Sequence, residues 1–274
     1  MKFAICNEMF EGWPWERVCD FVRSLGYTGL EVAPFTLAES AEQVSPQRRR
    51  QLRETAERRG VQILGLHWLL VKPAGLYVTH PDPSIRKRTA DYFVSLVHLC
   101  ADLGGNVMVI GSPKQRNLQP GVSREQAVGF AQEVFTPALE PAAERGVTLA
   151  FEPLGPEETD FMNTVAESME LVRRIGHPHF QLNLDIKAMS TEPMPIPDVI
   201  RSARGHIAHV QVNDPNRLGP GMGEVRCEPI IAALREVGWD GWLSVEAFDC
   251  RPGVETIARQ SIEYLKRVTG VVER

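Results

Sequence analysis

The sequence predicts a single-domain α/β protein with the (β/α)8 barrel fold, also called a TIM barrel, over residues 1–274. Its length of 274 residues suits one such barrel, which typically needs about 250 residues. Eight short apolar segments recur along the chain, and 274 divided by eight gives about 34 residues per strand–helix unit. These segments show no strict polar alternation, as expected for strands that are buried on both faces of a parallel sheet.

The apolar segments define the strands in chain order. We expect them near residues 2–6, 29–33, 61–67, 106–111, 147–152, 180–185, 207–212 and 241–246. Each is followed by a segment that can form a helix, although the one near 196–203 is short. A doubly wound open sheet is the alternative fold, but it normally has a glycine-rich phosphate-binding turn after its first strand. Residues 6–10, CNEMF, contain no such turn.

Local signals mark where the helices begin and end. Asp82 precedes Pro83, so a capping side chain lies just before a proline at the first helical position. Gly60 and Gly146 each separate a helix-forming segment from an apolar strand, and a glycine there permits the positive φ of a helix C-terminus. These signals support the alternation of helices and strands.

Charge and cysteine content restrict the function. The chain has 30 basic and 35 acidic residues and a net charge of −5, whereas nucleic-acid-binding proteins usually have a basic excess. The five cysteines include no CxxC pair, which favours reduced thiols over disulfides or a thiolate zinc site. The apolar runs are shorter than the ~18 residues of a membrane span, and no secretory apolar region follows Met1. We therefore expect a cytoplasmic protein with a small-molecule substrate and no nucleic-acid or membrane partner, and leave homo-oligomer formation open.

Oxygen-bearing side chains end four consecutive predicted strands. Glu152, Asp185, Gln211 and Glu246 end the fifth to eighth strands and are 33, 26 and 35 residues apart. Every second side chain of a strand points to the same face, and small or polar residues such as Ala150 share the face of these four. Barrel active sites lie at the C-terminal ends of the strands, so we expect the four side chains to converge there.

This set of ligands indicates a divalent metal ion. Three ionised carboxylates in a dry pocket would repel one another until some became protonated, and a cation removes that repulsion. Three carboxylates and one amide suit a hard ion, Mn²⁺ by preference or Mg²⁺, and Co²⁺ or Zn²⁺ could substitute. The alternative is that the four residues are unrelated polar strand ends with local hydrogen bonds.

Such a site predicts proton transfer next to a carbonyl group. The ion would polarise the carbonyl of a ketose and acidify the neighbouring C–H bond. One glutamate would remove that proton to give an enediolate, and a second would return a proton. Return to the opposite face gives the epimer, whereas return to the neighbouring carbon gives aldose–ketose isomerisation.

The motifs around these residues resemble those of a known family. They read FEPLGPEETDFMNT, LNLDIKAM, HVQVNDPNRLGPGMGEV and GWDGWLSVE. The chain resembles, essentially end to end, the xylose isomerase-like barrels, specifically the branch of sugar isomerases and ketose 3-epimerases with D-tagatose 3-epimerase and hydroxypyruvate isomerase. The resemblance implies one divalent ion on Glu152, Asp185, Gln211 and Glu246, with Gln211 as the glutamine variant of hydroxypyruvate isomerase-like members. It also implies that Glu152 and Glu246 flank a sugar or keto-acid substrate as acid and base.

The resemblance also implies residues that bind the substrate. Arg217 matches an arginine that contacts substrate oxygens, and Glu158 matches a glutamate that binds a terminal hydroxyl; the alternatives are a surface arginine and a solvated loop carboxylate. His67 ends the third strand and should face the cleft, either as a substrate ligand or as a hydrogen-bonded barrel histidine. Glu31, which ends the second strand, is a secondary candidate of the same kind. The chain departs from the epimerases at Ala188, where they have a substrate-binding histidine. We do not expect Lys187 to replace that histidine, since its direction along the chain differs.

Three functions are compatible with the predicted site. The first is a metal-dependent sugar (ketose) isomerase or epimerase. The second is an inosose-dehydratase-like lyase on the same scaffold, in which the enediolate expels a β-hydroxyl. The third, an apurinic-site endonuclease, fits less well, because that class uses a histidine-rich three-metal cluster and Ala188 and Gln211 stand where it needs ligands. Lys114 and Arg116, after the fourth strand, indicate a solvated loop more than an anion site.

Overall fold

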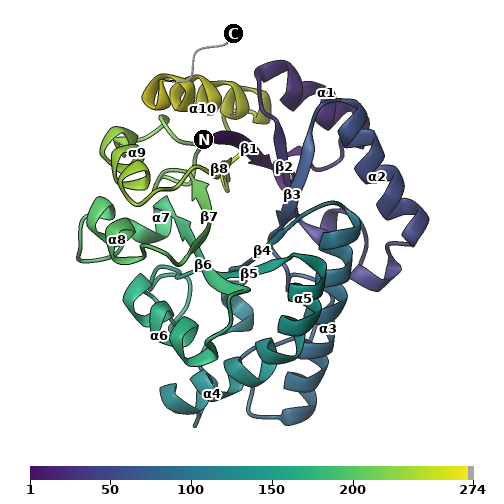
Figure 1. Ribbon diagram of the computed structural model, residues 1–274, viewed down its shortest axis with the longest axis vertical. Coiled ribbons are helices and arrows are strands. Elements are labelled where there is room, and N and C mark those ends of the chain that lie inside the picture. Colours follow the sequence, from purple (N-terminus) through teal and green to yellow (C-terminus); the bar gives the residue numbers. More distant parts are fainter. Residues whose placement is uncertain (271–274) are drawn as a thin grey trace.

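Eight parallel strands close into a barrel in the computed structural model, which describes residues 1–270 (Figure 1). In barrel order they are β1 (Lys2–Cys6), β2 (Gly29–Val32), β3 (Gln62–Leu66), β4 (Val107–Ile110), β5 (Thr148–Phe151), β6 (Phe180–Asp185), β7 (Ile207–Val212) and β8 (Trp242–Val245). The barrel closes between β8 and β1, where Ala4 lies opposite Ser244. The (β/α)8 prediction is confirmed, and each strand lies within one residue of its expected bounds.

Helices surround the barrel, as Figure 1 shows. They are α1 (Trp15–Leu25), α2 (Pro46–Arg58), α3 (Pro83–Asp102), α4 (Arg124–Phe135), α5 (Leu139–Arg145), α6 (Val165–Ile175), α7 (Ile186–Met189), α8 (Ile196–Ser202), α9 (Cys227–Glu236) and α10 (Val254–Thr269). Short 3₁₀ helices are η1 (Glu8–Phe10), η2 (Pro34–Thr36), η3 (Ala41–Gln43), η4 (Pro113–Gln115) and η5 (Thr136–Ala138). The short helix expected near 196–203 is α8. Within residues 1–270, no helix has the length and apolar character needed to cross a membrane.

The expected helix boundaries are present. Asp82 caps α3, and its Oδ1 accepts a hydrogen bond from the backbone N–H of Ser84 at 2.8 Å. Gly60 and Gly146 have φ angles of +72° and +66°, which a residue with a Cβ adopts only with strain. The chain can therefore leave each helix and enter the next strand within a few residues.

Apolar side chains fill two regions on opposite faces of the sheet. Between the strands and the helices lies the larger core, which includes the contacting rings of Phe93, Phe135, Phe151 and Phe180. A smaller, separate cluster consists of Ala4, Leu64, Val107 and Ala150, from four different strands. Ala150 shares its face with Glu152, so this cluster fills the barrel interior beneath the polar strand ends.

Candidate active site

Three of the four predicted strand-end residues converge in space. Glu152 follows β5, Asp185 ends β6 and Glu246 follows β8. Each of these carboxylates has an oxygen within 4.8 Å of an oxygen of the other two. The three residues are only 6%, 1% and 5% exposed, so little water screens the repulsion between them. We call them the carboxylate triad.

Hydrogen bonds orient two members of the triad. The Oδ1 atom of Asp185 accepts from the backbone N–H of Ala188 at 2.8 Å, and its Oδ2 accepts from Nδ2 of Asn213 at 2.6 Å. The Oε1 atom of Glu246 accepts from the indole N–H of Trp68 at 3.1 Å. Each of these two carboxylates is therefore held in a defined direction at the barrel mouth.

A hydrogen bond to the backbone of Glu152 fixes its main chain, and a neighbouring glycine leaves room for its carboxylate. Arg116 donates from Nη1 to the carbonyl oxygen of Glu152 at 2.6 Å, and its guanidinium lies 4.9 Å from the ring centroid of Phe151. Because Arg116 turns inward in this way and is 1% exposed, the expectation of a solvated loop is wrong for this residue. Gly111 follows β4, and a Cβ on it would lie 2.4 Å from Oε2 of Glu152, so the glycine leaves room for that carboxylate.

Burial and mutual repulsion disfavour the charged forms of the triad. Burial raises the pKa of Glu152 well above its ordinary value, and the charge of Asp185 raises it further, against the opposing charge of Arg116. Burial also raises the pKa of Glu246 well above the ordinary value, and the charges of Glu152 and Asp185 add to the effect. The pKa of Asp185 rises through burial too, although Lys187 opposes it. The triad thus lacks sufficient positive charge within the described chain to ionise fully.

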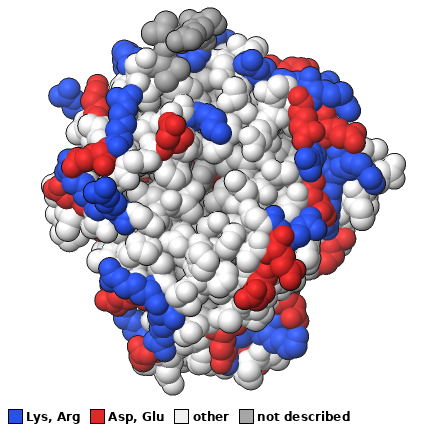
Figure 2. Space-filling model, in the orientation of Figure 1, with Lys and Arg blue, Asp and Glu red and all other residues white. Residues whose placement is uncertain are grey.

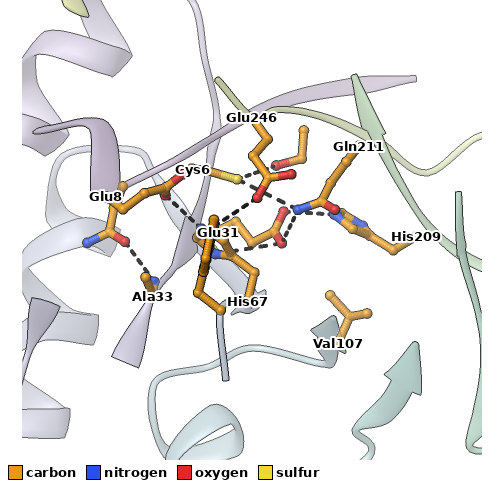
Figure 3. A network of polar contacts seen from close by, with 12 residues as sticks. Cys6, Glu8, Glu31, Ala33, His67, Val107, His209, Gln211 and Glu246 are labelled. Carbon is orange, nitrogen blue, oxygen red and sulfur yellow. Dashed lines mark hydrogen bonds and ion pairs between the residues drawn. The ribbon is translucent and has the colours of Figure 1, made fainter. Parts of the chain in front are cut away.

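The triad fits a hard divalent ion, because its oxygens converge and its charge is under-compensated. Gln211, the fourth predicted ligand, lies opposite Asp185 in the β6–β7 register and is fully buried. Its Oε1 accepts from Nδ2 of Asn183 at 2.7 Å. Its Nε2 donates to Oε1 of Glu31 at 3.0 Å (Figure 3). A role of Gln211 as a metal ligand stays a prediction.

A second charged cluster lies beside the triad at the ends of β1 to β3 and in β7. It consists of Glu8, Glu31, His67 and His209, which we call the histidine–glutamate cluster (Figure 3). His67 Nε2 lies 2.6 Å from Oε2 of Glu8, and its Nδ1 lies 3.7 Å from Oε1 of Glu31. His209 Nε2 lies 2.8 Å from Oε2 of Glu31. His67 was expected at the site, and Glu31 was a secondary candidate of the same kind, whereas Glu8 and His209 were not expected to bind there.

Within the histidine–glutamate cluster, the histidines and the carboxylates stabilise one another's charged forms. Burial opposes ionisation of Glu31, but the neighbouring His209 and His67 outweigh it and lower the pKa of Glu31 to about 2. Burial likewise opposes the charged form of His67, and the carboxylates of Glu8 and Glu31 outweigh it and raise the pKa of that histidine. Opposite charges are therefore paired within the cluster.

The triad opens into a cavity of about 630 Å³, a volume typical of small-molecule sites. Glu152 and Glu246 line it, as do the three residues predicted to bind substrate, His67, Glu158 and Arg217. Their contact with a substrate stays a prediction. Figure 2 shows one face of the molecule, on which lysine, arginine, aspartate and glutamate side chains are interspersed around a mostly uncharged centre.

Lys187 lines the same cavity and is 8% exposed, so the expectation that it points elsewhere is wrong. The alternation of a strand stops at Asp185, because α7 begins at Ile186 and turns the chain across the barrel mouth. The backbone N–H of Lys187 donates to Oδ1 of Asn213 at 2.8 Å and fixes this turn. A direction inferred from strand period therefore does not apply to this lysine.

Trp68 is a further cavity residue that was not expected from the sequence. It follows His67 and has a φ of +52°, a conformation that bulky residues rarely adopt. Its indole donates to Glu246, and its ring meets that of Phe248 edge-on with centroids 6.2 Å apart. The unusual backbone thus directs an indole N–H at one of the two predicted acid/base residues.

Known proteins of the same fold resemble this chain along most of its length. A family model described as xylose isomerase-like TIM barrel matches residues 19–268. The chain is 27% identical over 277 residues to a D-psicose 3-epimerase of Enterocloster bolteae, across 92% of this chain and 84% of the relative. It is 25% identical over 184 residues to an L-ribulose 3-epimerase of Mesorhizobium japonicum, across 67% of this chain and 62% of the relative.

Solved structures agree in fold. A crystal structure of D-psicose 3-epimerase in the presence of D-fructose superposes with a TM-score of 0.86 at 20% identity, across 98% of this chain and all of that one. A structure of L-ribulose 3-epimerase gives a TM-score of 0.84 at 20% identity, across 98% and 95% of the two chains. Together with the family match over residues 19–268, these observations show that the chain belongs to the xylose isomerase-like TIM barrel family.

Proposed function

We propose that this protein is a divalent-metal-dependent sugar isomerase that epimerises or isomerises ketoses. The observation that carries the proposal is the carboxylate triad, buried and under-compensated, at the wall of a cavity of sugar-sized volume. The relatives named D-psicose 3-epimerase and L-ribulose 3-epimerase are isomerases, and they support this class of reaction and a sugar substrate. We take Mn²⁺ as the first ion to test.

The two glutamates of the triad are suited to exchange protons with a substrate. A carboxylate can accept a proton and later return it, and Glu152 and Glu246 both line the cavity where a substrate would bind. What a bound divalent ion supplies is polarisation of the ketose carbonyl and acidification of the neighbouring C–H bond, with Glu152, Asp185, Gln211 and Glu246 as its ligands.

The remaining steps belong to the side chains. One glutamate takes the proton as the C–H bond breaks, and the bonding electrons pass towards the carbonyl oxygen to give an enediolate. The other glutamate returns a proton to the opposite face of the same carbon, which yields the epimer. If the first proton came from the terminal carbon, return of a proton to the adjacent carbon, with transfer of the hydroxyl proton from one enediolate oxygen to the other, yields the aldose. Trp68 keeps Oε1 of Glu246 in a fixed direction through its indole N–H.

The proposal is tested by hydrogen exchange. The Mn²⁺-loaded protein is incubated with a panel of ketoses in D₂O, and mass spectrometry measures deuterium incorporation into carbon. We expect incorporation into at least one ketose, and we expect Glu246→Gln to abolish it, because the amide cannot carry the proton. Glu263→Gln is the matched control, since Glu263 is exposed on the outer helix α10, and it should leave exchange unchanged.

Two results would overturn the proposal. Exchange that persists in both Glu152→Gln and Glu246→Gln would remove the two glutamates from the reaction. A ketose or related substrate that loses water, with a new carbonyl signal in the NMR spectrum, would assign the site to a lyase instead.

A further inference from the structure

A lysine–glutamate pair lies inside the cavity beside the carboxylate triad. Lys187 comes from α7, and Glu158 comes from the loop after β5. The Nζ atom of Lys187 donates to Oε2 of Glu158 at 2.5 Å, and the two side chains are only 10% and 25% exposed. Both residues line the cavity wall. We call them the Lys187–Glu158 pair.

The surroundings keep the lysine charged and hold it in place. Burial disfavours its ammonium form, but the carboxylates of Asp185 and Glu158 outweigh burial and raise the pKa of Lys187. The Nζ atom lies 5.1 Å from the ring centroid of Phe248, and the guanidinium carbon of Arg217 lies 5.8 Å from the same centroid. Phe248 is therefore the common wall against which both cations are placed.

The pair has spare hydrogen-bonding capacity of both kinds. An ammonium has three donors, and one of them is used by Glu158, while an ionised carboxylate accepts several hydrogen bonds. A hydroxyl group donates one hydrogen bond and accepts others, so it can satisfy both members of such a pair at once. Hydroxyls on adjacent carbons match a donor and an acceptor that are themselves in contact.

The charges argue against an anionic group at this position. A phosphate or carboxylate that approached Nζ of Lys187 would also approach the carboxylate of Glu158, which lies in hydrogen-bond contact with that atom, and like charges so close in a poorly solvated site are unfavourable. A neutral hydroxyl meets no such repulsion. The pair thus favours an unphosphorylated, polyhydroxylated end of the substrate.

We propose that Lys187, held in the cavity wall by its ion pair with Glu158, donates a hydrogen bond to a substrate hydroxyl group away from the reacting carbons, and is therefore a specificity-determining residue of this chain. This inference rests on the proposed function. Lys187 would also supply a hydrogen-bond donor in α7, just after β6, where the side chain of Ala188 has no donor.

The test combines one substitution with one missing hydroxyl. The kcat/KM of the Mn²⁺-loaded wild type and of Lys187→Met is measured on an active ketose and on its monodeoxy analogues, one position at a time. For one analogue we expect the wild type to lose about 10- to 100-fold, as for a hydrogen bond to a charged group. Lys187→Met should lower kcat/KM for the parent ketose and leave kcat/KM for that analogue unchanged. The difference between the two substrates should therefore vanish in this variant.

Three further variants keep the test specific. Lys187→Arg retains the charge and the donors and should preserve much of the discrimination, and Glu158→Gln should weaken it without removal of the lysine. Lys87→Met is the matched control, because Lys87 forms an exposed pair with Asp91 at 2.7 Å on α3 and should behave as wild type. If Lys187→Met fails to fold, as judged by circular dichroism, Lys187→Arg and Glu158→Gln carry the test.

Failure of this inference is distinct from failure of the proposed function. If wild type exchanges deuterium with ketoses but Lys187→Met and Glu158→Gln lower kcat/KM equally for the parent and every deoxy analogue, the pair is structural and the inference is wrong. A wild-type preference for phosphorylated ketoses that Lys187→Met removes would also overturn it. If no ketose exchanges deuterium with the wild type at all, the proposed function itself fails.

Discussion

Glu31 and Glu246 are both buried glutamates at the mouth of one barrel, yet their neighbours affect them in opposite ways. Glu246, on the β5–β8 side, faces Glu152 and Asp185, and its pKa lies well above the ordinary value of 4.5. Glu31, on the β1–β3 side, faces two histidines, and its pKa falls to about 2. Burial alone would raise both values, so the identity of the nearest charges decides the sign.

This difference shows which of the two clusters needs a positive charge from a bound ion or proton. The histidine–glutamate cluster contains both charges that it requires, so it can remain ionised and rigid by itself. The charges of Arg116 and Lys187 only partly compensate the carboxylate triad, so the triad can bind a metal ion or protons. Contacts between Gln211 and Glu31, and between Trp68 and Glu246, join the two regions.

The largest effect is expected for Glu31→Gln. Loss of this carboxylate leaves the buried His209 without its carboxylate partner and His67 with Glu8 alone, and removal of one member of a buried ion pair costs about 3 kcal/mol of unfolding free energy. Urea denaturation at pH 7 measures the change. Glu255→Gln is the control, because the exposed pair of Glu255 with Arg17 should contribute less than about 1 kcal/mol.

This destabilisation should depend on pH. The folded-state pKa of Glu31 lies below the ordinary 4.5, so its stabilisation is complete above that value and is lost as the pH falls towards about 2. The difference between wild type and Glu31→Gln should therefore shrink between pH 4.5 and 2. A difference that stays constant over this range would contradict the compensated-cluster description.

The next effect concerns the space around Glu152. Gly111→Ala places a Cβ about where Oε2 of Glu152 now lies, since the two atoms would be 2.4 Å apart. The carboxylate must move, and a displacement of this kind lowers kcat/KM by about 100-fold. Gly129→Ala, in α4 with no heavy atom within 4 Å of the new Cβ, should keep full activity and gain slight stability. Full activity in Gly111→Ala would mean that Glu152 needs no fixed position.

A smaller effect of opposite sign is expected for Glu152→Gln in metal-free protein. The neutral amide relieves repulsion within the triad, so the melting temperature should rise by about 2–4 °C, equivalent to ~1 kcal/mol for a chain of this size. Because the folded-state pKa of Glu152 is raised, the wild type loses stability as the pH rises from 4.5 through that higher value, and the difference should grow accordingly.

The same variant tests the need for a cation. Mn²⁺ should raise the melting temperature of the wild type, because a ligand that binds only the folded state stabilises it. Glu152→Gln should respond much less. A variant that is less stable than wild type without metal, or that responds equally to Mn²⁺, would show that the triad is already compensated.

The smallest effect concerns the cysteines. Cys250 is exposed at the surface, although partial desolvation and the charges of Glu8 and Asp249 raise its pKa. Cys6 ends β1 in the barrel mouth, and its full burial raises its pKa well above the ordinary value. Native protein should therefore incorporate one iodoacetamide slowly, at Cys250, and faster as the pH rises. Cys250→Ser should remove this label and change stability by less than about 0.5 kcal/mol. Label on Cys6 in native protein, found by peptide mass spectrometry, would show that the mouth opens.

Local sequence patterns were sufficient for the framework of this protein. Apolar segments of four to six residues, spaced one strand–helix unit apart, predicted every strand within one residue. The period of two along a strand then predicted that Glu152, Asp185 and Glu246 share the inner face, and their carboxylates do converge. Both properties depend on neighbours within a few residues, which the sequence contains directly.

Other features arise only when distant segments meet. Glu31 pairs with His209 across 178 positions, after a register shift between Leu30 and Glu31 in the β2–β3 pairing that strand period cannot predict. Lys187 enters the cavity because the chain becomes helical right after β6, and Arg116 is buried because the end of β5 accepts its hydrogen bond. The sequence by itself determined which residues face the barrel axis, since that follows from local backbone geometry. Only the tertiary structure decided which of their charges are neutralised, because compensation depends on atoms brought within a few ångströms by barrel closure.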